Sequence, residues 1–269
     1  MLRLPLRTLP PHVAATLQAY ENEVLAEPDY PARVALAKQR FKQRNTATNA
    51  TFREIRNTLG EMCAGARRCM YCEDSMADEV EHHRPKDLYP GQVFSWNNYL
   101  YACGPCNSPK QNKFAIIDAR QQRIDVARKK GDPIVPPIPG ATALLDPRVD
   151  DPLDFLMLDI AGNTFLFVAI PGLPVVETLR AEYTIELLKL NDRDPLPRAR
   201  REAFHNYRAR LVEYVSKAEA GASQSELHLL VDALQRMGHP TVWQEMKRQR
   251  TLIPELNTLF TQASQALTW

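Results

Sequence analysis

The sequence predicts an α+β protein that is mostly helical and carries one small, cysteine-rich unit with short strands. Three observations support this prediction. Apolar residues recur every three or four positions at both ends of the chain, which is the spacing of a helix face. Two C-x-x-C pairs lie between these helical regions. A Gly-Asn pair between two short apolar runs predicts a β-hairpin. We therefore expect a helical scaffold that carries a compact metal-binding unit.

Residues 1–60 are expected to form an N-terminal helical region. Apolar positions keep a helical spacing from Val13 to Val24 and again from Val34 to Phe41. The whole chain has a net charge of only +2, but segment 31–68 carries nine basic and two acidic residues, a local net charge of +7. This basic segment is either a solvated helix face or part of a nucleic-acid-binding surface.

The remainder of the chain divides into three predicted parts. Residues 61–130 hold the cysteine, histidine and asparagine residues, and residues 131–174 form a Pro-rich connector that includes the hairpin around Gly162-Asn163. Residues 175–269 are expected to be helical, with one long helix from about Arg198 to about Lys217. The first residues are interrupted by Pro and Arg, and no apolar run is long enough to span a membrane.

Four of the five cysteines form two closely spaced pairs. Cys69 and Cys72 are separated from Cys103 and Cys106 by 30 residues, 73–102, while Cys63 stands apart. Four thiolates at this spacing predict a closed tetrahedral zinc site that organises structure and leaves no open position for a substrate. A redox or iron–sulfur centre is the alternative, but the surrounding Asn and His residues disfavour it.

The segment between and after the cysteine pairs holds residues suited to hydrolysis. Glu81, His82 and Asn98 precede the second pair, and Asn107 follows it directly. An acid, an imidazole and amides in one unit suit phosphodiester hydrolysis with one divalent metal ion, in which the imidazole activates water. The sequence therefore indicates a catalytic function in addition to a zinc-stabilised fold.

The order C-x-x-C, E-H-x-x-P, N-x-L and C-x-x-C-N-x-x-K resembles the ββα-metal site of the HNH endonuclease family. The resemblance implies that His82 is the general base and that Glu81 and Asn107 bind Mg²⁺ or another divalent cation. It also implies that Asn98 holds the His-bearing strand and loop in place, and that the four-cysteine zinc joins the strand pair to the following helix. The products would carry 5′-phosphate and 3′-hydroxyl ends.

This sequence departs from the family pattern in two places. Glu81 stands where Asp is commoner, and Tyr99 stands where Leu usually follows the Asn directly. Neighbouring strand residues face opposite sides, so only one of His82 and His83 can readily face the metal. His82 lies three residues before Pro85, as the pattern requires, and is therefore preferred.

Basic residues flank the predicted site and are candidates for phosphate contacts. They are Arg84, Lys86, Lys110 and Lys113. Such contacts give affinity without sequence readout, but each of these residues is equally compatible with solvated surface charge.

A wider resemblance covers about residues 60–210. Leu144-Leu145-Asp146-Pro147-Arg148 and the segment from Thr184 to Asn191 are similar to the HNH subfamily of Septu and retron-associated anti-phage systems (PtuB-like). This implies a bacterial cytoplasmic nuclease that cleaves DNA together with an ABC/SMC-type ATPase (PtuA-like), with residues 1–60 and 211–269 as candidates for partner docking. Two alternatives stay open: a ribonuclease using the same site, for example one cutting transfer RNA, and a non-catalytic, zinc-stabilised module that binds nucleic acid.

Overall fold

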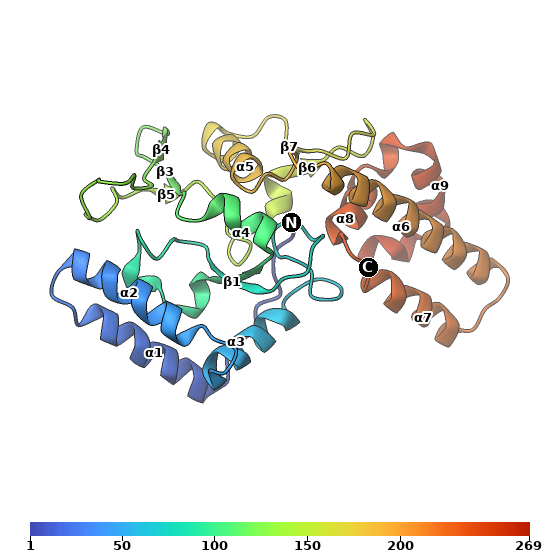
Figure 1. Ribbon diagram of the computed structural model, residues 1–269. Helices are drawn as coiled ribbons and strands as arrows, with labels where there is room; N and C mark the ends of the chain where they lie inside the picture. The colour runs from blue at the N-terminus through green and yellow to red at the C-terminus, as the bar shows by residue number, and fades with distance from the viewer.

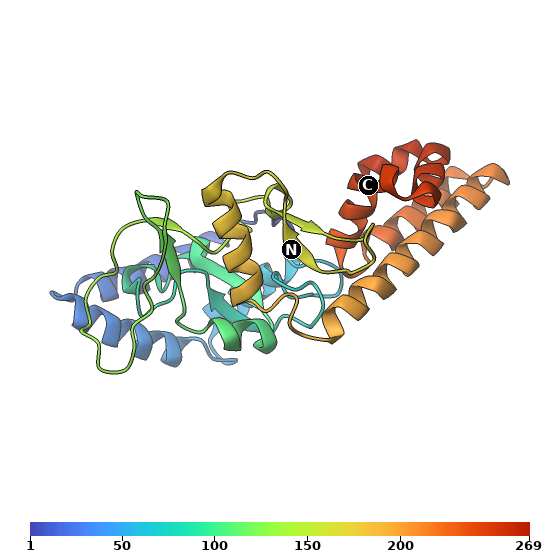
Figure 2. The ribbon, with the colours of Figure 1, turned by 90° about the horizontal axis from the view of Figure 1, so that it is seen from above.

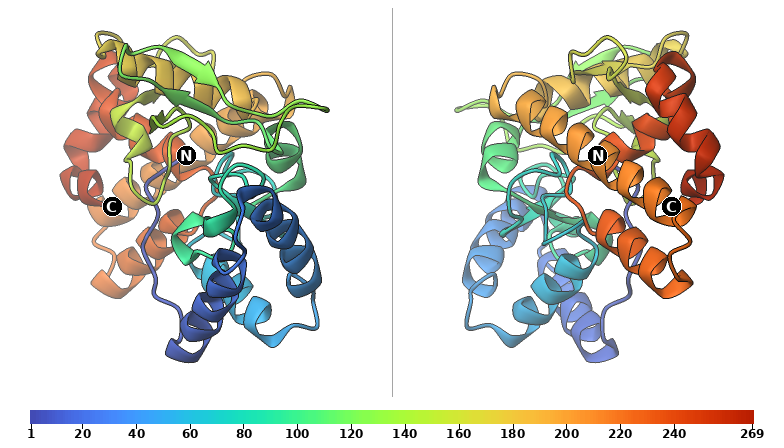
Figure 3. Two further views of the ribbon diagram at one scale, coloured as in Figure 1. Left: turned by 90° about the vertical axis from the view of Figure 1, so that its left-hand side faces the viewer. Right: turned by 90° about the vertical axis from the view of Figure 1, so that its right-hand side faces the viewer.

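The computed structural model describes residues 1–269 and has nine α-helices, seven short strands and five 3₁₀ turns. The N-terminal helices and the C-terminal helices lie on opposite sides of the molecule, with two of the small sheets between them and the three-stranded sheet above the N-terminal helices (Figure 1). Side views show the same separation of the two groups of helices (Figure 3). One continuous cluster of buried apolar residues extends from the first helix to the last turn. The predicted α+β, mostly helical class is confirmed.

Three helices form the N-terminal region: α1 (Pro11–Leu25), α2 (Tyr30–Arg44) and α3 (Ala50–Glu61). The side chain of Asp29 accepts a hydrogen bond from the Ala32 N–H at the start of α2, and Asn49 caps α3 through the Phe52 N–H. The predicted helical spacing is confirmed, because Val13, Val24 and Phe41 lie on buried faces.

A small ββα unit follows these helices. Strand β1 (Glu79–His82) pairs antiparallel with β2 (Tyr99–Ala102), with His82 opposite Tyr99. Helix α4 (Gly104–Lys110) begins directly after β2 and contacts β1. Two 3₁₀ turns, η1 (Pro90–Gln92) and η2 (Trp96–Asn98), shape the connection between the strands.

A three-stranded sheet comes next that the sequence patterns did not predict. Strand β3 (Ala115–Ile117) lies between β4 (Arg123–Asp125) and β5 (Ala141–Thr142) in an antiparallel sheet. Strands of two or three residues are too short to show a period-two pattern. Because β5 lies after residue 130, the Pro-rich connector contributes a strand to a sheet that begins in the preceding unit.

The predicted hairpin is present, but its connection is longer than a two-residue Gly-Asn turn. After the 3₁₀ turn η3 (Pro152–Asp154), β6 (Leu156–Leu158) pairs with β7 (Phe167–Ala169). The Asp159 carboxylate accepts a hydrogen bond from the Gly162 N–H, and a Cβ at position 162 would lie 2.4 Å from it. This close approach accounts for the glycine.

The C-terminal part is helical, as predicted. It consists of α5 (Val175–Leu187), the long α6 (Pro195–Glu219), α7 (Gln224–Gln235), α8 (Pro240–Arg248), α9 (Pro254–Gln262) and the 3₁₀ turns η4 (Arg250–Leu252) and η5 (Ser264–Thr268). Helix α6 extends away from the centre, and α7–α9 pack along it (Figure 2). No helix in the structure is both long enough and apolar enough to cross a membrane.

Candidate active site

The four predicted zinc ligands come together in one buried cluster. Their sulfur atoms all lie within 4.8 Å of one another, and the Cys72 and Cys103 sulfurs are 3.8 Å apart. In a tetrahedral site with Zn–S bonds of about 2.3 Å, neighbouring sulfurs lie about 3.8 Å apart. The donor set and its spacing therefore fit a zinc ion. Cys63 is not part of this cluster, and its thiol contacts the Leu59 carbonyl.

A backbone N–H and a guanidinium group orient two of the sulfurs and compensate their charge. The Cys103 N–H donates to the Cys69 sulfur (3.3 Å), and the Arg193 guanidinium donates to the Cys106 sulfur (3.2 Å). Such donors stabilise thiolates and fix ligand geometry. Arg193 lies between α5 and α6, so the cysteine cluster contacts the C-terminal helical part as well as the ββα unit.

His82 is the last residue of β1, and its ring is buried. Its Nε2 lies 2.9 Å from the Val93 carbonyl oxygen. A carbonyl can only accept a hydrogen bond, so Nε2 carries the proton and Nδ1 keeps a free lone pair. Burial lowers the pKa of His82 to about 3, and the positive charge of Lys86 acts in the same direction. The imidazole is therefore neutral at pH 7, the form that accepts a proton.

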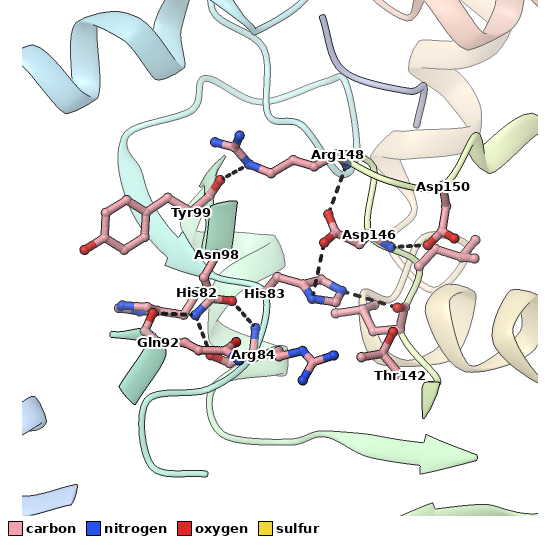
Figure 4. Close-up of polar contacts among 12 residues, drawn as sticks. His82, His83, Arg84, Gln92, Asn98, Tyr99, Thr142, Asp146, Arg148 and Asp150 are labelled. Atoms are coloured by element: carbon pink, nitrogen blue, oxygen red, sulfur yellow. Dashed lines mark hydrogen bonds and ion pairs between the residues drawn. The ribbon is translucent and has the colours of Figure 1, made fainter. Parts of the chain in front are cut away.

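Asn98 connects the two ends of the loop between β1 and β2 (Figure 4). Its Oδ1 accepts a hydrogen bond from the Arg84 N–H (2.7 Å), and its Nδ2 donates to the carbonyls of Arg84 and Gln92 (both 3.0 Å). The Gln92 carbonyl directly precedes Val93, whose carbonyl contacts His82. Asn98 thus fixes the segment that sets the tautomer of His82.

His82 lines a cavity of about 760 Å³, which we call the His82 pocket. Most of its lining is polar and comes from α2, α3, β1, α4 and adjacent loops. The lining combines acids, amides and cations: Asp78, Glu79, Glu81, Asn45, Asn107, Asn112, Arg56 and Lys86. Carboxylate and amide oxygens are the ligands that Mg²⁺ prefers, so this donor set fits a divalent cation.

One predicted phosphate contact is wrong. Lys110 is fully buried, and its ammonium donates to the His82 carbonyl (2.7 Å) and forms an ion pair with the Glu81 carboxylate. It therefore joins α4 to β1 instead of facing solvent. Burial raises the pKa of Glu81, and the charge of Lys110 opposes this effect. The carboxylate predicted to bind a divalent cation is thus held by an ammonium group in this structure.

Glu79 is a pocket residue that the sequence analysis missed. Its carboxylate accepts a hydrogen bond from the Asn107 side-chain amide at 2.6 Å, so β1 and α4 are linked at this point. Glu79 lies two residues before Glu81 in the same strand and lines the same pocket. The first acid of E-V-E-H is the sequence signal that could have identified it. Asn107, which was predicted, lines the pocket beside it.

The other predicted basic residues differ in position. Lys86 lines the His82 pocket, Arg84 lies partly exposed over the Tyr89 ring, and Lys113 is exposed. Part of the basic segment 31–68 is neutralised within the fold. Arg40 and Arg44 form ion pairs with the same Glu23, and Lys38 pairs with Asp87. Two carboxylates thus offset part of the charge of three cations, so the net positive charge of this surface is lower than the segment alone suggests.

His83 lies outside the His82 pocket. Its Nε2 is 3.3 Å from the Leu144 carbonyl oxygen and its Nδ1 is 3.8 Å from the Asp146 carboxylate (Figure 4). Burial lowers the pKa of His83 to about 4, against the opposing effect of Asp146. The ring also meets Phe114 edge to face. His83 is thus a packing residue in this structure.

Part of the chain is similar to two curated Septu proteins. It is 31% identical to the Septu protein PtuB of Bacillus mycoides over 126 residues, which is 40% of this chain and 39% of that protein. It is 46% identical to a Septu protein PtuB of Bacillus thuringiensis over 48 residues, 16% of this chain and 19% of the relative. No family model matches the chain, and no solved structure matches it. The comparisons therefore show similarity to Septu PtuB proteins over about two fifths of the length of the first and about one fifth of the second.

Proposed function

We propose that this protein is a metal-dependent endonuclease of the HNH type and serves in a Septu-type anti-phage defence system. One observation carries the catalytic part of the proposal. A neutral histidine, held in one tautomer by a carbonyl, shares a polar cavity with two glutamates and an asparagine. The similarity to Septu PtuB proteins supports the biological role.

The residues of the pocket have distinct roles in the proposed reaction. Nδ1 of His82 accepts a proton from the attacking water, while the Nε2–H bond to Val93 keeps the ring oriented. Asn98 keeps the Val93 segment in position. Glu79, Glu81 and Asn107 would hold a divalent cation such as Mg²⁺, which neutralises the charge of the scissile phosphate when bound. Lys110 orients Glu81 from its buried side.

The zinc has a structural role in this proposal. The four cysteine sulfurs would fill the four positions of a tetrahedral zinc ion and leave none open to water or a phosphate. A zinc ion bound there would hold the Cys69–Cys72 turn against α4. That turn leads into β1, which carries Glu79, Glu81 and His82, while α4 carries Asn107. Loss of the zinc would therefore separate the two sides of the proposed catalytic centre.

The proposed partner is an ABC/SMC-type ATPase (PtuA-like), and the proposed location is the cytoplasm. Both follow from the resemblance to the Septu subfamily and from the similarity to the PtuB proteins. The substrate we propose is DNA. The groups in the pocket would hydrolyse either nucleic-acid backbone, so the test includes RNA.

The proposal is tested by incubating the purified chain, alone and together with a PtuA-like ATPase, with labelled DNA or transfer RNA. We expect DNA cleavage that requires a divalent cation and yields 5′-phosphate ends. The Asn107→Ala variant lacks one amide of the pocket and should be inactive with its zinc content unchanged. Equal cleavage by the unmodified protein and the Asn107→Ala variant would contradict the proposal. So would the absence of cleavage with Mg²⁺, Mn²⁺, Ni²⁺ or Co²⁺. If the protein cleaved RNA and not DNA, the proposed substrate would have to be changed from DNA to RNA.

A further inference from the structure

The His82 pocket has a second wall, which the N-terminal helices provide. Phe41 near the end of α2, Asn45 and Ala47 in the following turn, and Arg56 of α3 line the cavity together with β1 and α4. Helix α3 also packs against β2. Residues 1–60 were expected to be a helical lead-in suited to partner docking, but this corner of α2 and α3 takes part in the pocket itself.

Arg56 is held in a fixed position on this wall. Its guanidinium donates to the Asn45 side-chain oxygen (2.7 Å) and to the Thr46 carbonyl (2.5 Å). Both partners are neutral, whereas Arg40 and Arg44 of the same basic segment pair with the Glu23 carboxylate. A guanidinium has five N–H donors, so Arg56 keeps an uncompensated charge and further donors for a ligand. The side chain is only partly exposed.

A second cation lines the same pocket. The Lys86 ammonium lies 5.5 Å from the centre of the Phe41 ring of α2. The cavity thus combines carboxylates on the β1 side with Arg56 and Lys86 facing the same space. A phosphodiester substrate needs both kinds of group, because a divalent cation binds the carboxylates while neighbouring phosphates pair with guanidinium and ammonium groups.

We infer that Arg56 binds a backbone phosphate of the nucleic-acid strand that enters the His82 pocket. This inference rests on the proposed function and assigns substrate binding to α3. Arg56 is a positioning residue: it orients the strand through a phosphate, while His82 acts on the attacking water. Planar guanidinium donors match phosphate oxygens in pairs, which an ammonium cannot do.

The test compares Arg56→Gln with Arg53→Gln in the full-length His82→Ala protein, where cleavage does not consume the ligand. Arg53 lies one turn earlier on α3, is exposed and does not line the pocket, so it is a matched loss of one positive charge. A labelled DNA duplex is titrated in Ca²⁺ at several salt concentrations. We expect Arg56→Gln to weaken binding about tenfold and to reduce the salt slope by about 0.9. Arg53→Gln should change the affinity less than about twofold.

Arg56→Lys separates charge from a structural role, since it keeps the cation but loses the contacts to the α2–α3 turn. The Arg56→Lys protein should bind DNA more tightly than the Arg56→Gln protein and less tightly than the protein that keeps Arg56. Equal affinity of the Arg56→Gln and Arg53→Gln proteins, equal losses for Lys and Gln, or no DNA binding by the His82→Ala parent would overturn the inference. Absence of cleavage by the unmodified chain would instead contradict the proposed function, and the binding comparison remains decisive for Arg56.

Discussion

His82, the last residue of strand β1, and His83, the residue directly after it, differ in how their polar groups are satisfied. His82 lines a cavity of about 760 Å³ whose lining is mostly polar, and its Nδ1 keeps a lone pair. His83, the next residue, contacts the Leu144 carbonyl and lies near Asp146 in a closed environment (Figure 4). Adjacent residues of identical type therefore lie in different environments at the point where β1 ends.

The side on which His83 lies, which we call the closed face, forms a brace that holds the ββα unit against the connector and α5. Arg148 donates to the Tyr99 carbonyl of β2 (2.7 Å), and the Leu145 N–H donates to the Thr184 hydroxyl of α5 (3.0 Å). These hydrogen bonds join buried groups of separate segments to one another, as is usual in a core. Where polar groups instead face a shared cavity, they are available to a ligand. This contrast distinguishes the face that we assign to catalysis from the face that supports it.

Removal of the zinc should affect both faces and have the largest effect. Cys106→Ser removes one ligand from the cluster and also the sulfur that Arg193 contacts. Since a structural zinc contributes several kcal/mol to folding, we expect a lower melting temperature, less than one zinc per chain and loss of cleavage. Cys63→Ser is the matched control because its thiol lies outside the cluster. Full zinc content and stability in Cys106→Ser would show that the cluster is not a structural metal site.

A change on the brace should lower stability without changing the chemistry. Thr184→Val leaves the buried Leu145 N–H without its acceptor, which should reduce the free energy of unfolding by about 1–3 kcal/mol. Thr258→Val on the exposed face of α9 should change it by less than about 0.5 kcal/mol. Urea denaturation gives both values, and the cleavage rate of the folded proteins should be equal. A large loss of cleavage rate in the folded Thr184→Val protein would contradict the distinction between a catalytic side and a supporting side.

The sequence predicted the parts of this fold that depend on local patterns. Apolar spacing located the helices, and the C-x-x-C pairs identified the cysteines that cluster. Patterns failed where a residue's environment depends on distant segments. Lys110 is basic and close to the site, but its partners are in β1, 28 residues earlier, and they bury it completely.

The same limit applies to the pocket. Arg56 lies in a basic stretch whose members look alike in sequence, yet Arg40 and Arg44 are paired with Glu23 while Arg56 lines the cavity. The different environments of these arginines arise only when α2 and α3 pack against the ββα unit. The strands β3–β5 were missed for a different reason, since two or three residues carry too little periodicity.

The most direct test of the central claim compares His82→Ala with His83→Ala in one DNA cleavage assay, with zinc content and melting temperature measured on the same samples. His82→Ala should lower the cleavage rate by about 10²–10⁴-fold at unchanged zinc content, because the proton acceptor is lost. His83→Ala should lower the melting temperature and leave the rate of the folded protein within about threefold, because its ring only packs in the brace. The reverse result, or equal rates for the two variants, would contradict the assignment of catalysis to the His82 face.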